Sequence, residues 1–189
     1  MEVGWFILNN EKLQKTIFLD RDGVINQCAK PHCYITKWED FHFMPRVAEG
    51  IKILNDLGYL VLIVTNQRGI SRGICTVSEI EVIHQNMCEE LAKDGARIDG
   101  IYVCPHDRYE CDCRKPLPGL FYQAKAEWLI DKKQSYCIGD SKTDIQAGHN
   151  YGIQAILIGK AEQKYGQELT FGSLLDASIY LKEMEANKK

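Results

Sequence analysis

The chain contains 189 residues with a formal net charge of -3, and 45% of its residues are hydrophobic and 26% charged. This composition is ordinary for one soluble globular domain, and the slight acidic excess provides no basic surface for nucleic acid. Because no apolar run approaches the roughly 20 residues that cross a bilayer, we also expect no membrane partner.

Five short apolar runs predict β-strands, at residues 16–20, 59–65, 100–104, 135–139 and 154–158. The second run is almost wholly apolar, which is the pattern of a strand buried on both faces. Strands of this kind belong to parallel sheets that helices cover on either side.

Helices are predicted between these strands and after the last one, at residues 45–57, 76–91, 120–130, 144–150 and 173–186. Gly58 stands where a C′ glycine ends a helix, and Thr76 with Glu79 forms a capping box that opens the next one. Alternating strands and helices imply right-handed crossovers. The expected fold is therefore α/β, a Rossmann-like open parallel sheet with helices on both faces. We expect a single domain over residues 1–189 with its core at about residues 16–160.

Two carboxylates follow the first predicted strand in the motif Asp20-Arg21-Asp22-Gly23. Positions i and i+2 of an extended segment share one side, so Asp20 and Asp22 lie together at the C-terminal mouth of the strand. In an open parallel sheet this edge binds ligands. The pair is suited to hold Mg²⁺ through oxygen atoms, with one carboxylate as nucleophile and the other moving protons. The plain alternative is a solvated loop with two surface acids.

Polar residues also follow the other predicted strands: Thr65 ends the second, Lys115 comes after the third and Asp140 after the fourth. Parallel strands bring these ends to one edge, so together they predict a phosphoryl-transfer site. Asp20, Asp140 and a backbone carbonyl would hold Mg²⁺, which offsets the repulsion between a phosphate ester and an anionic nucleophile. Asp20 would attack to form an aspartyl-phosphate, and Asp22 would protonate the leaving alkoxide.

In combination these motifs resemble those of the haloacid dehalogenase superfamily of aspartate-nucleophile phosphatases. More narrowly, the chain is similar to the D-glycero-D-manno-heptose 1,7-bisphosphate 7-phosphatases and to their relatives, the histidinol-phosphate phosphatases. The motifs that carry the resemblance are Asp20-Arg21-Asp22-Gly23-Val24-Ile25-Asn26, Thr65-Asn66-Gln67, Arg114-Lys115-Pro116 and Gly139-Asp140-Ser141-Lys142-Thr143-Asp144. The match covers residues 16–158.

The resemblance implies that Asp20 is the nucleophile and that Asp22 is the general acid and base. It also implies that Mg²⁺ is bound by Asp20, by the backbone carbonyl of Asp22 and by Asp140. Asp144, one helical turn past Asp140, is interpreted as support for these ligands. The chain departs from the heptose enzymes at Ser141, where they usually carry a basic residue.

The residues expected to bind the phosphoryl group and the rest of the substrate are Asn26, Thr65, Asn66, Arg68, Arg72, Arg114 and Lys115. The Thr65 hydroxyl and the Lys115 ammonium would meet the phosphoryl oxygens as charge develops. The resemblance makes Arg114 a substrate-recognition residue. Arg68 and Arg72 flank a glycine turn, where they are either ordinary loop charges or partners of a second phosphate.

A cluster of soft ligands within ten residues predicts a structural Zn²⁺ site with no open coordination position. Its members are Cys104, His106, Cys111 and Cys113. Eight cysteines also suit a disulfide scaffold, but residues 1–8 lack the basic n-region of a signal peptide. We therefore expect a reduced, cytoplasmic protein. Because Cys113 precedes Arg114 and Lys115, the metal would fix the loop that carries them; the alternative is four unrelated side chains.

The segments between the motifs leave no room for a separate cap domain, so we expect an open site whose specificity is set by loops. This favours a monomer that hydrolyses a small bisphosphorylated sugar, D-glycero-D-manno-heptose 1,7-bisphosphate, to the 1-phosphate. One alternative is a histidinol-phosphate phosphatase, whose short ligand loop resembles the gap between His106 and Cys111. Another is a zinc-knuckle module that binds nucleic acid or protein. Cys28, His32 and Cys33 are expected to line the substrate entrance.

Overall fold

A single parallel sheet forms the centre of the computed structural model, which describes residues 12–30 and 33–187. The sheet has six strands in the order β3-β2-β1-β4-β5-β6, and each neighbouring pair is parallel. The strands are β1 (Thr16–Leu19), β2 (Leu60–Asn66), β3 (Gly100–Cys104), β4 (Tyr136–Gly139), β5 (Gln154–Ile158) and β6 (Leu169–Phe171).

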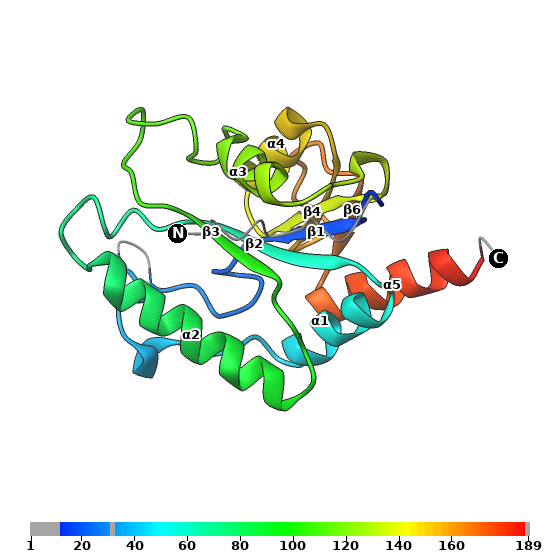
Figure 1. The fold of residues 1–189 in the computed structure, drawn as a ribbon, viewed down its shortest axis with the longest axis horizontal. Helices are drawn as coiled ribbons and strands as arrows, with labels where there is room; N and C mark the ends of the chain where they lie inside the picture. Colours follow the sequence, from blue (N-terminus) through cyan, green and yellow to red (C-terminus); the bar gives the residue numbers. More distant parts are fainter. Residues whose placement is uncertain (1–11, 31–32, 188–189) are drawn as a thin grey trace, which may run out of the picture.

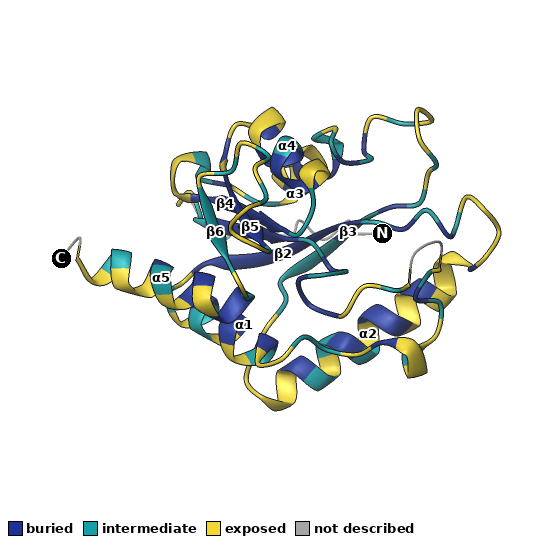
Figure 2. Ribbon diagram, turned by 180° about the vertical axis from the view of Figure 1, so that it is seen from behind, coloured by how far each residue is buried: buried dark blue, intermediate teal, exposed yellow. Residues whose placement is uncertain are grey.

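Helices cover both faces of this sheet (Figure 1). One face carries α1 (Val47–Asp56), α2 (Val77–Lys93) and α5 (Leu174–Ala186), and the other carries α3 (Gly119–Glu127) and α4 (Lys142–Tyr151). Successive side chains of a strand point to opposite faces, so Ile17 and Leu19 join the core under α1, α2 and α5 while Phe18 packs with α3 and α4. Burial is accordingly concentrated in the strands and in the helix surfaces turned toward them (Figure 2).

The predicted α/β fold is confirmed, and the five predicted strands end within one residue of their expected bounds. The short strand β6 was not predicted, because three half-buried residues carry too little periodicity. It leads into α5, whose Leu174, Ala177 and Leu181 belong to the main buried cluster. The core therefore extends beyond the expected limit at residue 160.

Helix α4 begins at Lys142, two residues earlier than predicted, and helix α3 ends early, at Glu127. The early start of α4 follows from a capping box: Asp144 Oδ2 accepts hydrogen bonds from the backbone N–H of Ser141 (3.0 Å) and from its hydroxyl (2.5 Å). Between β1 and α1 the described residues form one 3-10 turn, Trp38–Asp40, and no inserted domain. None of the helices in the described ranges is both long and apolar enough to cross a membrane.

Candidate active site

The catalytic candidates meet because β1 and β4 end within one residue of the same level of the sheet, while β2 continues beside them to Asn66. Leu19 of β1 pairs in register with Ile63 of β2 and Ile138 of β4. Asp20 and Asp140, which follow β1 and β4, therefore emerge side by side. The loops that follow β2 and β3 project from this edge as well (Figure 1).

Three carboxylates form a compact cluster at this edge: one oxygen each of Asp20, Asp140 and Asp144 lies within 4.8 Å of the others. Lys115 Nζ lies 2.9 Å from Asp20 Oδ1 and 2.6 Å from Asp144 Oδ1, with the lysine side chain 1% exposed. Gly23 has φ +90°, and a Cβ there would stand 2.1 Å from Asp140 Oδ2. Three carboxylates facing one ammonium leave a negative excess, and the oxygen donors fit a hard divalent cation such as Mg²⁺.

Asp20 and Asp140 bind protons more tightly than isolated carboxylates do, because their pKa values are raised. Burial and the charge of Asp144 raise the pKa of Asp20 to about 8, although Lys115 opposes this shift. Burial and Asp144 likewise raise the pKa of Asp140 to about 6. Burial lowers the pKa of Lys115, but the charges of Asp144 and Asp20 outweigh burial and raise it, so the ammonium stays charged. A bound cation would therefore displace protons from the carboxylates.

Asp22, unlike Asp20 and Asp140, is surrounded by hydrogen-bond donors and a positive charge. Arg21 Nη2 is 3.0 Å from both carboxylate oxygens, Asn26 Nδ2 is 2.9 Å from Oδ1, and Gln67 Nε2 is 3.0 Å from Oδ2. Burial raises the pKa of Asp22, but the charge of Arg21 and the three donors lower it by more. Asp22 is therefore ionised and ready to accept a proton. Neither Arg21 nor Gln67 was singled out as functional from the sequence, where the only signal was their place inside two motifs.

Two asparagines that are predicted to contact substrate form hydrogen bonds with candidate catalytic residues. Asn26 is fully buried and donates to Asp22 and to the carbonyl of Gln27, both at 2.9 Å. Asn66 donates to the carbonyl of Lys115 (3.2 Å) and accepts from its backbone N–H (3.1 Å). These hydrogen bonds orient Asp22 and Lys115, and a substrate contact stays a prediction for both asparagines.

Thr65 is buried with its hydroxyl proton available to a ligand. The side chain is 1% exposed, and the hydroxyl oxygen accepts a hydrogen bond from Gln67 Nε2 (2.9 Å), which leaves the hydroxyl proton free to be donated.

The two arginines of the loop after β2 form ion pairs within the protein. Arg68 and Arg72 both pair with Asp107 of the loop after β3, Arg72 through an Nε–Oδ2 distance of 3.4 Å. The arginines therefore connect the loops after β2 and β3. Because the Asp107 carboxylate partly neutralises their charge, they are less suited to bind phosphate.

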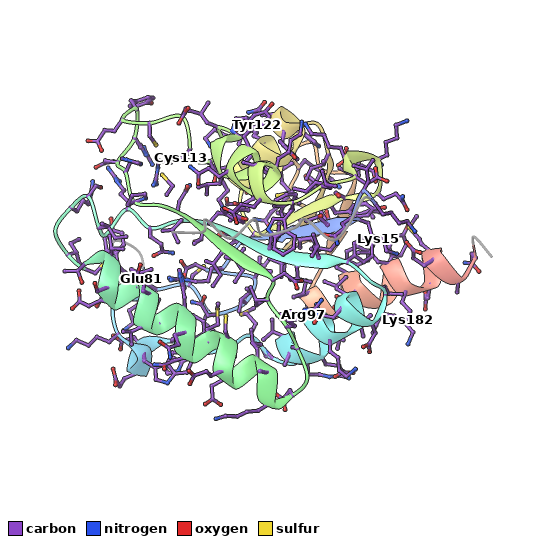
Figure 3. The ribbon with its side chains drawn as sticks, viewed as in Figure 1. Lys15, Glu81, Arg97, Cys113, Tyr122 and Lys182 are labelled. Carbon is purple, nitrogen blue, oxygen red and sulfur yellow. The ribbon has the colours of Figure 1, made fainter. Side chains whose placement is uncertain are left out.

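The four predicted zinc ligands come together at the start of the loop after β3, where Figure 3 labels Cys113. His106 Nδ1 lies 3.7 Å from Cys104 Sγ and 3.4 Å from Cys113 Sγ. Cys111 Sγ lies 3.6 Å from Cys104 Sγ and 3.3 Å from Cys113 Sγ. Tetrahedral zinc with bonds of about 2.0–2.3 Å spaces its ligand atoms by roughly 3.3–3.8 Å, so the donor set and its spacing suit this ion.

The same loop places Arg114 at the rim of a cavity of about 530 Å³. The guanidinium is anchored because Nη1 donates to the carbonyl of His106 at 3.1 Å. The cavity is lined by Asn66, Arg108, Tyr109, Cys111, Arg114, Lys115, Pro116, Leu117 and Thr143. These residues include three cations and, among the described residues, no carboxylate. The cavity is therefore suited to an anionic group beside Lys115.

The expected entrance residues are only partly described. Cys28 is exposed, and its Sγ lies 3.6 Å from Asp140 Oδ2, so it borders the carboxylate cluster. Cys33 is also exposed. His32 lies outside the described residues.

Comparison with known proteins places these features in a family context. A family model described as HAD-hydrolase-like matches residues 112–171. A D-glycero-beta-D-manno-heptose-1,7-bisphosphate 7-phosphatase of Haemophilus ducreyi is 37% identical over 182 residues, which cover 89% of this chain and 98% of that protein. A D-glycero-alpha-D-manno-heptose-1,7-bisphosphate 7-phosphatase of Campylobacter jejuni is 40% identical over 172 residues, covering 90% and 98%.

A solved structure is also similar over almost its full length. It is a D,D-heptose 1,7-bisphosphate phosphatase from B. bronchiseptica in complex with magnesium and phosphate. Its TM-score is 0.82 at 28% sequence identity, and the match covers 90% of this chain and 99% of that one.

Binding of Mg²⁺ to the metal-free protein is expected to release protons and to strengthen as the pH rises from about 6 to about 8. The reason is that Asp20 (pKa about 8) and Asp140 (pKa about 6) must lose protons before they can bind a cation. Calorimetric titration at several pH values, in buffers of different ionisation enthalpy, measures both effects. Asp56→Asn, which removes an exposed carboxylate of α1, is the control. An affinity that does not change with pH would contradict the raised pKa values.

Proposed function

The chain belongs to the heptose-1,7-bisphosphate 7-phosphatases of the haloacid dehalogenase-like hydrolases, and on that premise we propose that it hydrolyses the 7-phosphate of a D-glycero-D-manno-heptose 1,7-bisphosphate. The observation that carries the bisphosphate is the cationic cavity beside Lys115. One phosphoryl group would lie at the carboxylate cluster, and the cavity offers Arg108 and Arg114 to a second phosphate that is not cleaved.

The proposed reaction runs through Asp20. Its carboxylate attacks phosphorus, the bond from phosphorus to the leaving oxygen breaks, and an aspartyl-phosphate forms. Asp22 gives a proton to the leaving oxygen and later takes one from the water that hydrolyses the intermediate. Lys115 and the Thr65 hydroxyl stabilise the charge on the phosphoryl oxygens.

Asp20, Asp140 and the backbone carbonyl of Asp22 would hold the Mg²⁺. When bound, the ion neutralises phosphoryl charge. Asp22 also needs its proton for the first step, although its pKa is low in the free protein. The arrival of a phosphate dianion next to this carboxylate favours its protonated form, because like charges repel.

The cysteine and histidine cluster is proposed to bind structural Zn²⁺. All four protein ligands are present, so no position remains for substrate or water. Gly119, at the start of α3, abuts this loop so closely that a Cβ there would lie 2.5 Å from the carbonyl oxygen of Asp112. The ion would thus hold Arg114 and Lys115 against the sheet edge without taking part in the chemistry.

The proposal includes a single catalytic domain acting as a monomer in the cytoplasm, without nucleic acid or membrane. The slight acidic excess supports the part of this proposal that excludes nucleic acid. The histidinol-phosphate alternative is less well supported, because a monophosphate leaves the cationic cavity without a partner.

A phosphate-release panel tests the proposed function. The substrates are both anomers of heptose 1,7-bisphosphate, histidinol phosphate and p-nitrophenyl phosphate, each with Mg²⁺ and with chelator. We expect the highest kcat/KM for one of the heptose bisphosphates. A higher kcat/KM for histidinol phosphate would overturn the substrate, and turnover in excess chelator would overturn the metal requirement.

Arg114→Lys is expected to lower kcat/KM on the heptose bisphosphate about 10- to 100-fold, because an ammonium cannot reproduce the two parallel hydrogen bonds of a guanidinium to phosphate. Each factor of ten corresponds to about 1.4 kcal/mol of transition-state binding. On p-nitrophenyl phosphate the change should be small. Arg46→Lys, an exposed arginine at the start of α1, is the control. An equal loss on both substrates would place Arg114 at the reacting phosphoryl group.

Protein purified without chelator is expected to contain about one zinc per chain. Cys111→Ser should lose the zinc, lower the free energy of unfolding by at least about 2 kcal/mol and reduce turnover, because Arg114 and Lys115 lose their anchor. The control is Cys33→Ser, which changes an exposed thiol outside the cluster. Elemental analysis and thermal unfolding measure the outcome. Zinc-free protein with normal stability and activity would contradict the structural role.

A further inference from the structure

The buried guanidinium of Arg21 donates hydrogen bonds to the carboxylate of Asp22, the proposed acid and base. Arg21 is the largest fully buried side chain of the described residues. Its Nε lies 3.3 Å from Asp22 Oδ1, and its Nη2 lies 3.0 Å from each oxygen of Asp22 and 3.3 Å from Gln67 Oε1. The remaining nitrogen, Nη1, faces Nε2 of His84 at 3.1 Å. The orientation of Arg21 is therefore determined by partners on both of its sides.

The contact between Arg21 and His84 fixes the chemical form of the histidine. An arginine offers only N–H donors, so Nε2 of His84 has to be the acceptor and the ring proton has to sit on Nδ1. His84 is 7% exposed and lies on the inner face of α2. Burial and the positive charge of Arg21 lower the pKa of His84 to about 4. The ring is therefore neutral at physiological pH.

We propose that His84 is a positioning residue for catalysis, which acts on Asp22 through Arg21; this inference rests on the proposed phosphatase activity. Without an acceptor at Nε2, a buried N–H of a charged group would be unpaired, which is unfavourable because the group has lost its water without gaining a partner. The guanidinium would turn toward another partner or admit water. The oxygens of Asp22 would then leave the place where they meet the leaving group.

The role of Asp22 makes this proposal specific to certain substrates. When Asp20 attacks, the bond from phosphorus to the leaving oxygen breaks and the proton of Asp22 moves to that oxygen. An alkoxide leaving group needs this proton, whereas p-nitrophenolate is stable enough to leave without it. The value of kcat/KM reports steps up to the first irreversible one, so it isolates this proton transfer from the later hydrolysis of the intermediate.

Two substitutions of His84 distinguish its role as a hydrogen-bond acceptor from a role in which its ring only fills space in the core. His84→Leu keeps an apolar group of similar size, while His84→Gln keeps an oxygen that can accept from Arg21. We expect His84→Leu to lower kcat/KM on heptose 1,7-bisphosphate at least about tenfold and on p-nitrophenyl phosphate less than about threefold. His84→Gln should stay within about threefold of the unchanged protein on both esters. Met87→Leu, a buried change on the same face of α2, is the control.

Equal losses on the two esters, or equal losses in the Leu and Gln variants, would overturn the positioning role. A second measurement does not depend on activity or on the stability of a variant. Long-range ¹H–¹⁵N correlation spectra of the unchanged protein should show His84 neutral, with its proton on Nδ1. A proton on Nε2 would overturn the proposal. Absence of phosphatase activity on every ester would overturn the proposed function, while the ring proton would still decide whether His84 accepts from Arg21.

Discussion

The arrangement of the site depends on an excess of buried negative charge at the edge of the sheet. Asp20, Asp140 and Asp144 lie within reach of one another, and Lys115 sits between two of them. Charges removed from water are destabilising by several kcal/mol each unless they are compensated. The ammonium of Lys115 offsets part of this negative charge, and Asn66 holds the backbone of Lys115 in place. A divalent cation would offset the rest of the charge.

Neighbouring charges also explain how two aspartates so close in sequence would divide the proposed nucleophile and acid/base roles. Asp20 faces carboxylates, and burial together with the charge of Asp144 raises its pKa, so a bound cation would keep the carboxylate ionised. Asp22 faces Arg21 and two amides that outweigh burial and lower its pKa, which keeps it a proton acceptor between turnovers. Two carboxylates with opposite environments are the usual basis for separate nucleophile and acid/base roles. The loop after β3 adds the third element, a cationic cavity that is proposed to bind the part of the substrate that does not react.

Much of this arrangement could be predicted from the sequence because it depends on the backbone. Asp20 and Asp140 directly follow apolar strands, and parallel strands end together, so their meeting required no knowledge of side-chain packing. The contacts that orient them could not be predicted in the same way. Arg21 was given no role from the sequence, yet it is fully buried, and its Nη1 contacts Nε2 of His84, which lies on a helix more than sixty residues away. The two hydrogen bonds between the Asn66 amide and the backbone of Lys115 could not be predicted either, because the two residues are 49 positions apart in the sequence.

The central claim is that Asp20 carries the phosphoryl group, and chemical trapping tests it most directly. Asp22→Asn lacks the base for hydrolysis of the intermediate but can still react with p-nitrophenyl phosphate, whose leaving group needs no proton. Reaction of this variant with p-nitrophenyl phosphate and Mg²⁺, followed by acid quench, borohydride reduction and peptide mass spectrometry, should find homoserine at position 20, the product of reducing an aspartyl-phosphate. Release of p-nitrophenol with Asp20 unmodified and with no phosphoryl group on the protein would contradict the account.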